Sequence, residues 1–115
     1  MNNRLALGLL LVAPAWSAAD TAGPIDLANR YATCAAYYFN AVNTKPMQEY
    51  EAVYGAGERS FNEAIKLVGR QQVDHLMEQA AGAMTKLMNA DWNNFPSVEH
   101  KYGTECDSLV GALAP

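Results

Sequence analysis

Cysteine is scarce in this 115-residue chain, and the motifs of most enzyme chemistries are missing. The two cysteines, Cys34 and Cys106, form neither the C-x-x-C pair of thiol oxidoreductases nor the C-x-x-C-H motif that attaches c-type haem. The chain also lacks H-E-x-x-H for zinc, G-x-S-x-G for a serine nucleophile, a glycine-rich phosphate loop and the paired Glu-x-x-His of di-iron bundles. We therefore predict a protein that is not an enzyme and needs no cofactor.

Basic residues are few and scattered, with 8 Lys and Arg against 12 Asp and Glu. Residues 1–19 contribute only Arg4 to these charges, so the rest of the chain carries a net charge of about −5, which repels nucleic acid and anionic lipid. No Asn-x-Ser/Thr sequon occurs, and no segment after residue 19 is apolar for long enough to cross a membrane. We predict no nucleic-acid partner and no membrane span in the mature chain.

The longest apolar run stands at the N-terminus and has the layout of a signal peptide. Arg4 supplies the positive start, Leu5 to Ala15 form the apolar run, and Ser17-Ala18-Ala19 place small residues at the cleavage site. We expect residues 1–19 to be a signal peptide and residues 20–115 to be a single helical domain. The predicted location is the periplasm, with the extracellular space as the alternative.

Apolar residues recur at helical spacing through the rest of the chain, and no stretch alternates as a strand does. We predict helices over residues 24–43, 46–68 and 71–93, and a last helix that starts near Ser97. Pro24 and Pro46 suit the first helical turn, while Thr44 and Ser97 can serve as caps. Short connections favour antiparallel neighbours, so the predicted fold is an all-α, up-down four-helix bundle.

The second predicted helix contains Gly55 and Gly57. The apolar positions around them keep one phase, which favours a continuous helix with Tyr50, Tyr54, Phe61, Ile65 and Val68 on its apolar face. Gly57 lies on that face, where it would let a neighbouring helix come close. The alternative is a break at the glycines, because two glycines cost about 2 kcal/mol of helix propensity.

Cys34 and Cys106 lie near the middles of the first and last predicted helices, which are antiparallel neighbours in such a bundle. In an oxidising compartment we expect a disulfide between them. Closing so long a loop stabilises the fold by roughly 4 kcal/mol in the chain-entropy model. A redox-active pair and two buried thiols are the alternatives.

His75 and His100 lie opposite the apolar faces of their helices, so we expect both to face water. A weaker alternative is a soft-metal site, such as one for copper, because Met47, Met84, Met88 and His100 map to one end of the bundle. Methionine also fills irregular cores, and this is the simpler interpretation.

Aromatic residues gather near the end of the bundle where the first helix stops and the last one starts. The candidate contact patch consists of Tyr37, Phe39, Trp92 and Phe95. Tyr37, Phe39 and Trp92 lie away from the centres of the apolar faces, and we expect them to be exposed. The alternative is that these residues only seal the bundle.

Three short motifs resemble small, uncharacterised exported helical proteins of proteobacteria. They are Cys34-Ala35-Ala36-Tyr37-Tyr38, Asp91-Trp92-Asn93-Asn94 and Tyr102-Gly103-Thr104-Glu105-Cys106, a C-A-x-Y-Y … Y-x-x-x-C pattern. The resemblance implies a helical fold and a cysteine pair, and it implies no activity. The layout is also similar to that of acid-stress periplasmic chaperones and of periplasmic immunity proteins.

These observations favour a secreted or periplasmic helical protein that acts by contact with a protein or peptide partner. One alternative is a periplasmic carrier of a small ligand or of a metal. Another is an immunity protein, an inhibitor or a stress chaperone.

Overall fold

The computed structural model describes residues 23–113, and the predicted signal peptide, residues 1–19, lies outside them. The described residues form helices and short connections, without a strand. This confirms the predicted all-α fold.

The helices follow the predicted order. Helix α2 spans Pro24–Ala41, and its proline lies in the first turn, where an N–H would have no helical partner. Helices α3 (Tyr50–Val68) and α4 (Arg70–Leu87) meet at Gly69, whose φ of 86° suits glycine. The C-terminal run consists of α5 (Phe95–Val98), a π-helical turn (Glu99–Gly103) and α6 (Thr104–Gly111).

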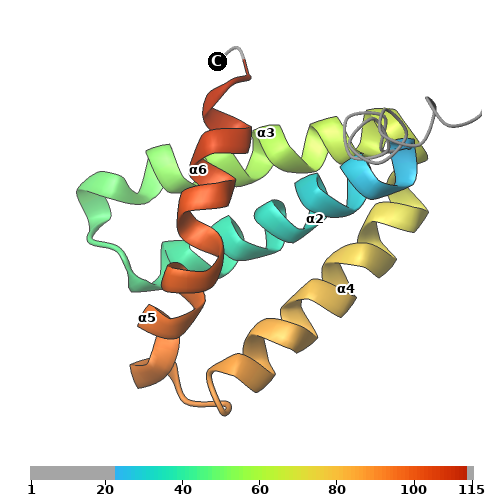
Figure 1. Ribbon diagram of the computed structural model, residues 1–115. Coiled ribbons are helices and arrows are strands. Elements are labelled where there is room, and N and C mark those ends of the chain that lie inside the picture. The colour runs from blue at the N-terminus through green and yellow to red at the C-terminus, as the bar shows by residue number, and fades with distance from the viewer. Residues whose placement is uncertain (1–22, 114–115) are drawn as a thin grey trace, which may run out of the picture.

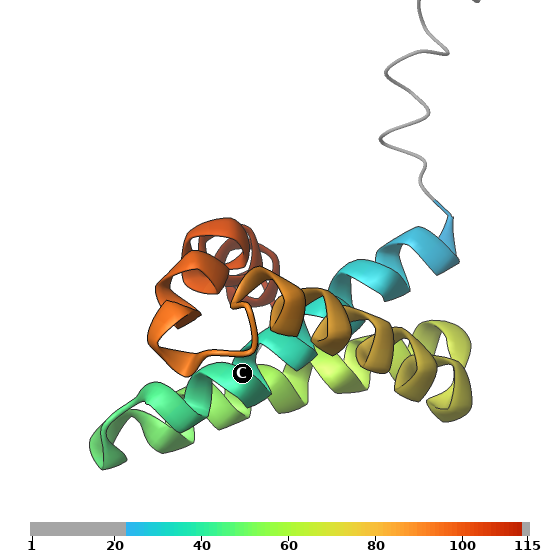
Figure 2. The same ribbon diagram turned by 90° about the horizontal axis from the view of Figure 1, so that it is seen from below.

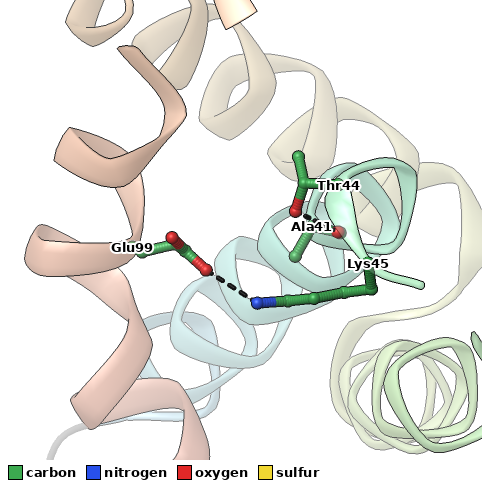
Figure 3. Close-up of polar contacts among 4 residues, drawn as sticks. All are labelled: Ala41, Thr44, Lys45 and Glu99. Carbon is green, nitrogen blue, oxygen red and sulfur yellow. Dashed lines mark hydrogen bonds and ion pairs between the residues drawn. The ribbon is translucent and has the colours of Figure 1, made fainter. Parts of the chain in front are cut away.

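Two 3₁₀ turns, Val42–Thr44 and Met47–Glu49, connect α2 to α3. The Thr44 hydroxyl donates a hydrogen bond of 2.8 Å to the carbonyl of Ala41, so it closes the end of α2 (Figure 3). The prediction that Thr44 caps the next helix is therefore wrong.

Helix α3 is continuous through both of its glycines, which settles the alternative of a break. A Cβ atom on Gly57 would lie 2.6 Å from Cε1 of Phe39, so only glycine lets the ring of α2 pack there. Nearby, the buried Ser60 hydroxyl donates a hydrogen bond of 2.6 Å to the carbonyl of Tyr31. Helices α2 and α3 lie side by side and run in opposite directions (Figure 1).

Helix α4 ends at Leu87, several residues before the predicted end at residue 93. Asn89 and Ala90 have positive φ angles of 58° and 56°. Their N–H groups donate to the carbonyls of Lys86 and Thr85, which is the Schellman pattern of a helix end. The chain then turns at Asp91, whose carboxylate accepts a hydrogen bond from the N–H of Asn93.

The C-terminal run begins two residues earlier than predicted, so Ser97 lies inside α5 and does not cap it. The π-helical turn contains Gly103, where a Cβ atom would lie 3.2 Å from the hydroxyl oxygen of Tyr37. Val98 and Gly103 are both buried and lie five residues apart, which is the hydrogen-bond spacing of a π-helix. The turn therefore keeps one side of this run against α2.

Helix α2 is the central element, in contact with α3, α4 and α6. Figures 1 and 2 show α6 crossing α2, with α3 and α4 packed on other sides of the same helix. A disulfide joins Cys34 of α2 to Cys106 of α6, with the two Cα atoms 5.3 Å apart. The predicted helical bundle with a disulfide between its first and last helices is thus confirmed.

The disulfide generates the first testable prediction. Replacing Cys106 with Ser should lower the free energy of unfolding by roughly 4 kcal/mol, because the unfolded chain regains the entropy of a long open loop. Chemical denaturation followed by circular dichroism measures this change. Cys34→Ser is the matched control and should have the same effect. A loss below about 1 kcal/mol would show that the bond does not constrain the unfolded chain.

The close approach of α2 to α3 generates a second prediction. Gly57→Ala should lower the free energy of unfolding by about 1–3 kcal/mol, because the new methyl group must displace the Phe39 ring. Gly82→Ala is the control, since a Cβ there meets nothing within 4 Å in the middle of α4. It should instead stabilise the protein by about 0.5–1 kcal/mol. If urea denaturation shows that both variants gain the same stability, the close packing at Gly57 is contradicted.

Candidate functional site

The four residues of the predicted contact patch divide between two aromatic groups. In the first, the ring of Phe95 stacks on Tyr37 at 6.2 Å and on Trp92 at 5.6 Å between centroids. Trp92 is 48% exposed, as predicted, whereas Tyr37 and Phe95 are buried. The prediction that Tyr37 is exposed is wrong, because the π-helical turn brings Gly103 against its hydroxyl group. This group mainly seals the core.

The second group lies where α2 meets the start of α3. Phe39 is partly buried and packs against Tyr54 at 5.3 Å, and the Tyr54 ring stacks on Tyr50 at 5.7 Å. Met47 is 86% exposed, Tyr50 45% and Tyr54 39%. We call Phe39, Met47, Tyr50 and Tyr54 the aromatic stripe.

Tyr50 and Tyr54 belong to the face of this helix that was predicted to be apolar, yet both are exposed. The first turns of α3 extend past the region where α4 packs, so part of this face has no helix opposite it (Figures 1 and 2). The sequence predicts an apolar helix face for Tyr50 and Tyr54, and it offers Met47 only as part of the weaker metal alternative. The i, i+3, i+7 spacing of these three residues puts them on one side of a helix, and it does not tell whether a neighbouring helix covers that side.

The surroundings of the aromatic stripe are acidic. Glu49, Glu51 and Glu58 are exposed, and the sequence has no basic residue from 46 to 58 and no charged residue from 31 to 44. Lys45 donates to Oε2 of Glu99 at 2.9 Å, so its charge is already paired (Figure 3). This hydrogen bond is the main reason why the pKa of Lys45 is raised.

A polar cluster joins α2, α3 and α6 beside a groove of about 250 Å³. The hydroxyl of Tyr38 donates a hydrogen bond of 2.6 Å to Oδ1 of Asp107. Burial, followed by this bond, raises the pKa of Tyr38 well above its usual range. Burial also raises the pKa of Tyr37 to about 12. Both phenols therefore stay protonated at neutral pH and act as donors rather than bases.

Arg59 lines the same groove and holds its Nε atom buried without a hydrogen-bond partner. Its positive charge acts to lower the pKa of Tyr38, against the larger effect of burial. One cation, Arg59, and one carboxylate, Asp107, therefore line the same groove.

A larger open groove of about 690 Å³ lies between α2 and α6. Arg30 and Glu105 form an ion pair at 3.7 Å on its wall, with both side chains more than half exposed. Lys101 also lines it and stands 5.5 Å from the ring centroid of Tyr102. The groove is therefore wide and lined by solvated charges.

The candidate metal ligands have different environments. His75 and His100 are exposed, as predicted. Met84 and Met88 are buried in the core around the disulfide, whereas Met47 faces solvent. Within residues 23–113, no group of three or more His, Cys, Asp and Glu side chains is placed to hold a metal ion. Met84 and Met88 pack in this core, and the Asn40 amide stands 4.0 Å from the Met84 sulfur.

Comparison of the chain with protein-family models, with curated proteins and with solved structures finds no match. The resemblance to small exported proteobacterial proteins therefore stays a prediction. Among the helices of the described range, none has the length and apolar character that a bilayer crossing requires.

The Tyr38–Asp107 bond generates a prediction with a defined pH dependence. At neutral pH, Tyr38→Phe should lower the free energy of unfolding by about 1–2 kcal/mol, because Asp107 loses its donor. Above about pH 10 the tyrosine ionises in the unfolded chain but stays protonated in the folded one, so the wild-type protein loses stability there. The variant has no tyrosine at this position and does not lose this stability. The difference in the free energy of unfolding between the two proteins should therefore become smaller above about pH 10.

Denaturation of both proteins from pH 7 to 11 measures this difference. Tyr50→Phe is the control, since it removes a hydroxyl from an exposed ring and should change stability little across the whole range. A gap between Tyr38→Phe and wild type that stays constant above pH 10 would contradict the raised pKa.

Proposed function

We propose that this protein is a non-enzymatic helical protein of the periplasm that binds another protein or a peptide through the aromatic stripe. The observation that carries the proposal is the exposure of the stacked rings of Tyr50 and Tyr54 on α3, together with Met47 in the 3₁₀ turn just before it. Soluble proteins normally scatter such residues singly, and grouped exposed apolar side chains mark interaction sites.

The packing of Phe39 beneath the exposed tyrosine rings favours a binding surface. Phe39 packs against the backbone at Gly57 and against Tyr54, which limits the movement of the exposed rings. Tyrosine offers a large contact area with few rotatable bonds, so little entropy is lost when a partner covers it. A stripe held in this way is ready for contact before the partner arrives.

Several observations favour a non-enzymatic role. The buried phenols of Tyr37 and Tyr38 are held protonated, and His75 and His100 lie in solvent rather than in a cleft. A catalytic acid or base usually needs a pKa near the working pH inside a pocket. These four groups lack that combination.

Periplasmic location is supported by the disulfide, which is typical of proteins that fold in an oxidising compartment. The predicted signal peptide at residues 1–19 agrees with it. The surface suits an immunity protein, an inhibitor and a stress chaperone alike, because each acts by contact with another protein.

A carrier of a small ligand is the second candidate, and the α2–α6 groove is the observation that favours it. Its volume of about 690 Å³ falls in the range of ligand sites. Native mass spectrometry of protein purified gently from its host tests this candidate. A bound mass that disappears in a Leu109→Lys variant, which would fill the groove, favours a carrier; a bare mass contradicts it.

Site-directed photo-crosslinking in the native host tests the binding function. A benzophenone amino acid in place of Tyr50 or Tyr54 should give one shared adduct, because both side chains face the same partner. The same residue in place of the exposed His75 on α4 is the control and should give none. If position 50 gives no adduct, or only those that position 75 gives, the proposed function is wrong.

A further inference from the structure

The aromatic stripe has carboxylates along its outer edge. Glu51 and Glu58 are three residues before and four residues after Tyr54, so all three share one side of α3. From Met47 to Glu58 this side covers about three helical turns, roughly 16 Å. Apolar rings and negative charges therefore alternate over the length of a short helix.

The stripe has no cation of its own. Lys45 is held by Glu99, and α2 has no basic residue in its last turn. Arg59 follows Gly57 by two residues and lies on another side of α3, where it lines the same groove as Tyr38 and Asp107. The carboxylates of the stripe thus stay without a positive partner among residues 23–113.

Elsewhere on the protein, two partly buried aromatic rings do have such a partner. Arg70 stands 5.2 Å from the ring centroid of Phe61, and Lys101 stands 5.5 Å from that of Tyr102. Phe61 follows Tyr54 by seven residues and continues the same side of α3. The face is therefore covered by a cation at Phe61 and left open at Tyr50 and Tyr54.

We propose that the partner of the aromatic stripe is a cationic amphipathic helix, which lays an apolar side on Tyr50, Tyr54 and Met47 and directs Lys or Arg toward Glu51 and Glu58. This proposal rests on the proposed function and names the chemistry of the partner. Cations of the incoming helix also lie over the tyrosine rings, where the attraction grows as water is removed. The three-turn length of the stripe matches a partner helix of about 11 to 14 residues.

A second copy of this chain is a poorer fit. Two stripes brought face to face would place Glu51 and Glu58 of one molecule near those of the other, and like charges in an interface are repulsive. The net charge of −4 for the whole chain adds to this repulsion. Opposite charge on the partner removes the conflict.

The experiment uses the exported, oxidised protein and a synthetic amphipathic peptide of Leu and Lys with helical spacing. Fluorescence anisotropy of the labelled peptide measures Kd at low and at high salt. A scrambled peptide of identical composition is the peptide control, because it has the same charge without an apolar side. We expect the amphipathic peptide to bind at least about tenfold more tightly than the scrambled one.

Variants locate the binding. Tyr50→Gln with Tyr54→Gln should raise Kd about tenfold or more, because the apolar contact is lost. Glu51→Gln with Glu58→Gln should raise Kd about fivefold at low salt and weaken its salt dependence. Asp26→Asn with Glu78→Gln removes two exposed carboxylates from α2 and α4, away from the stripe, and should leave Kd within about twofold. Circular dichroism confirms that each variant is folded.

Two results would overturn the proposal. In one, the scrambled peptide binds as tightly as the amphipathic peptide; in the other, the Asp26 and Glu78 variant loses as much affinity as the Glu51 and Glu58 variant. A concentration-dependent dimer that the tyrosine variant abolishes would assign the stripe to a second copy instead. A crosslinked adduct at Tyr50 without any binding of the cationic peptide would leave the contact function standing and refute the cationic partner.

Discussion

Helix α6 ends a continuous helical run that begins at Phe95, and the bond between Cys34 and Cys106 fixes this run against α2. Weaker contacts reinforce this bond. Arg30 and Glu105 pair one turn before it along α2, while Tyr38 and Asp107 form their hydrogen bond one turn after it. Surface ion pairs contribute little alone. The covalent bond therefore determines where the other contacts can form.

Helix α2 links this anchored end of the chain to the candidate binding surface. One side of α2 carries the disulfide and Tyr38, and another side presents Phe39 to Gly57 of α3. Because the ring meets backbone rather than a flexible side chain, α2 and α3 hold a close spacing. The exposed tyrosines of α3 rest on that contact. The stability of the fold and the exposure of the candidate binding surface thus both depend on α2.

Sequence patterns predicted the helix order, the cysteine pair and the close approach at Gly57, because each follows from periodicity or from one residue type. They did not predict the end of α4, where Asn89 and Ala90 form a left-handed turn without glycine or proline. The burial of Tyr37 depends on Gly103, far away in the sequence. The exposure of Tyr50 depends on which neighbours cover α3. Periodicity identifies an apolar face, and only the packed fold shows how much of it is covered.

The π-helical turn Glu99–Gly103 holds one residue more than the same turn of an α-helix, and it sets the rotation of everything that follows. An α-helix advances about 100° per residue, so removal of one residue there would turn Cys106 by more than a quarter of a circle. Its sulfur would then point past Cys34. Although this turn lies partly on the surface, its length is tied to the covalent connectivity of the whole domain.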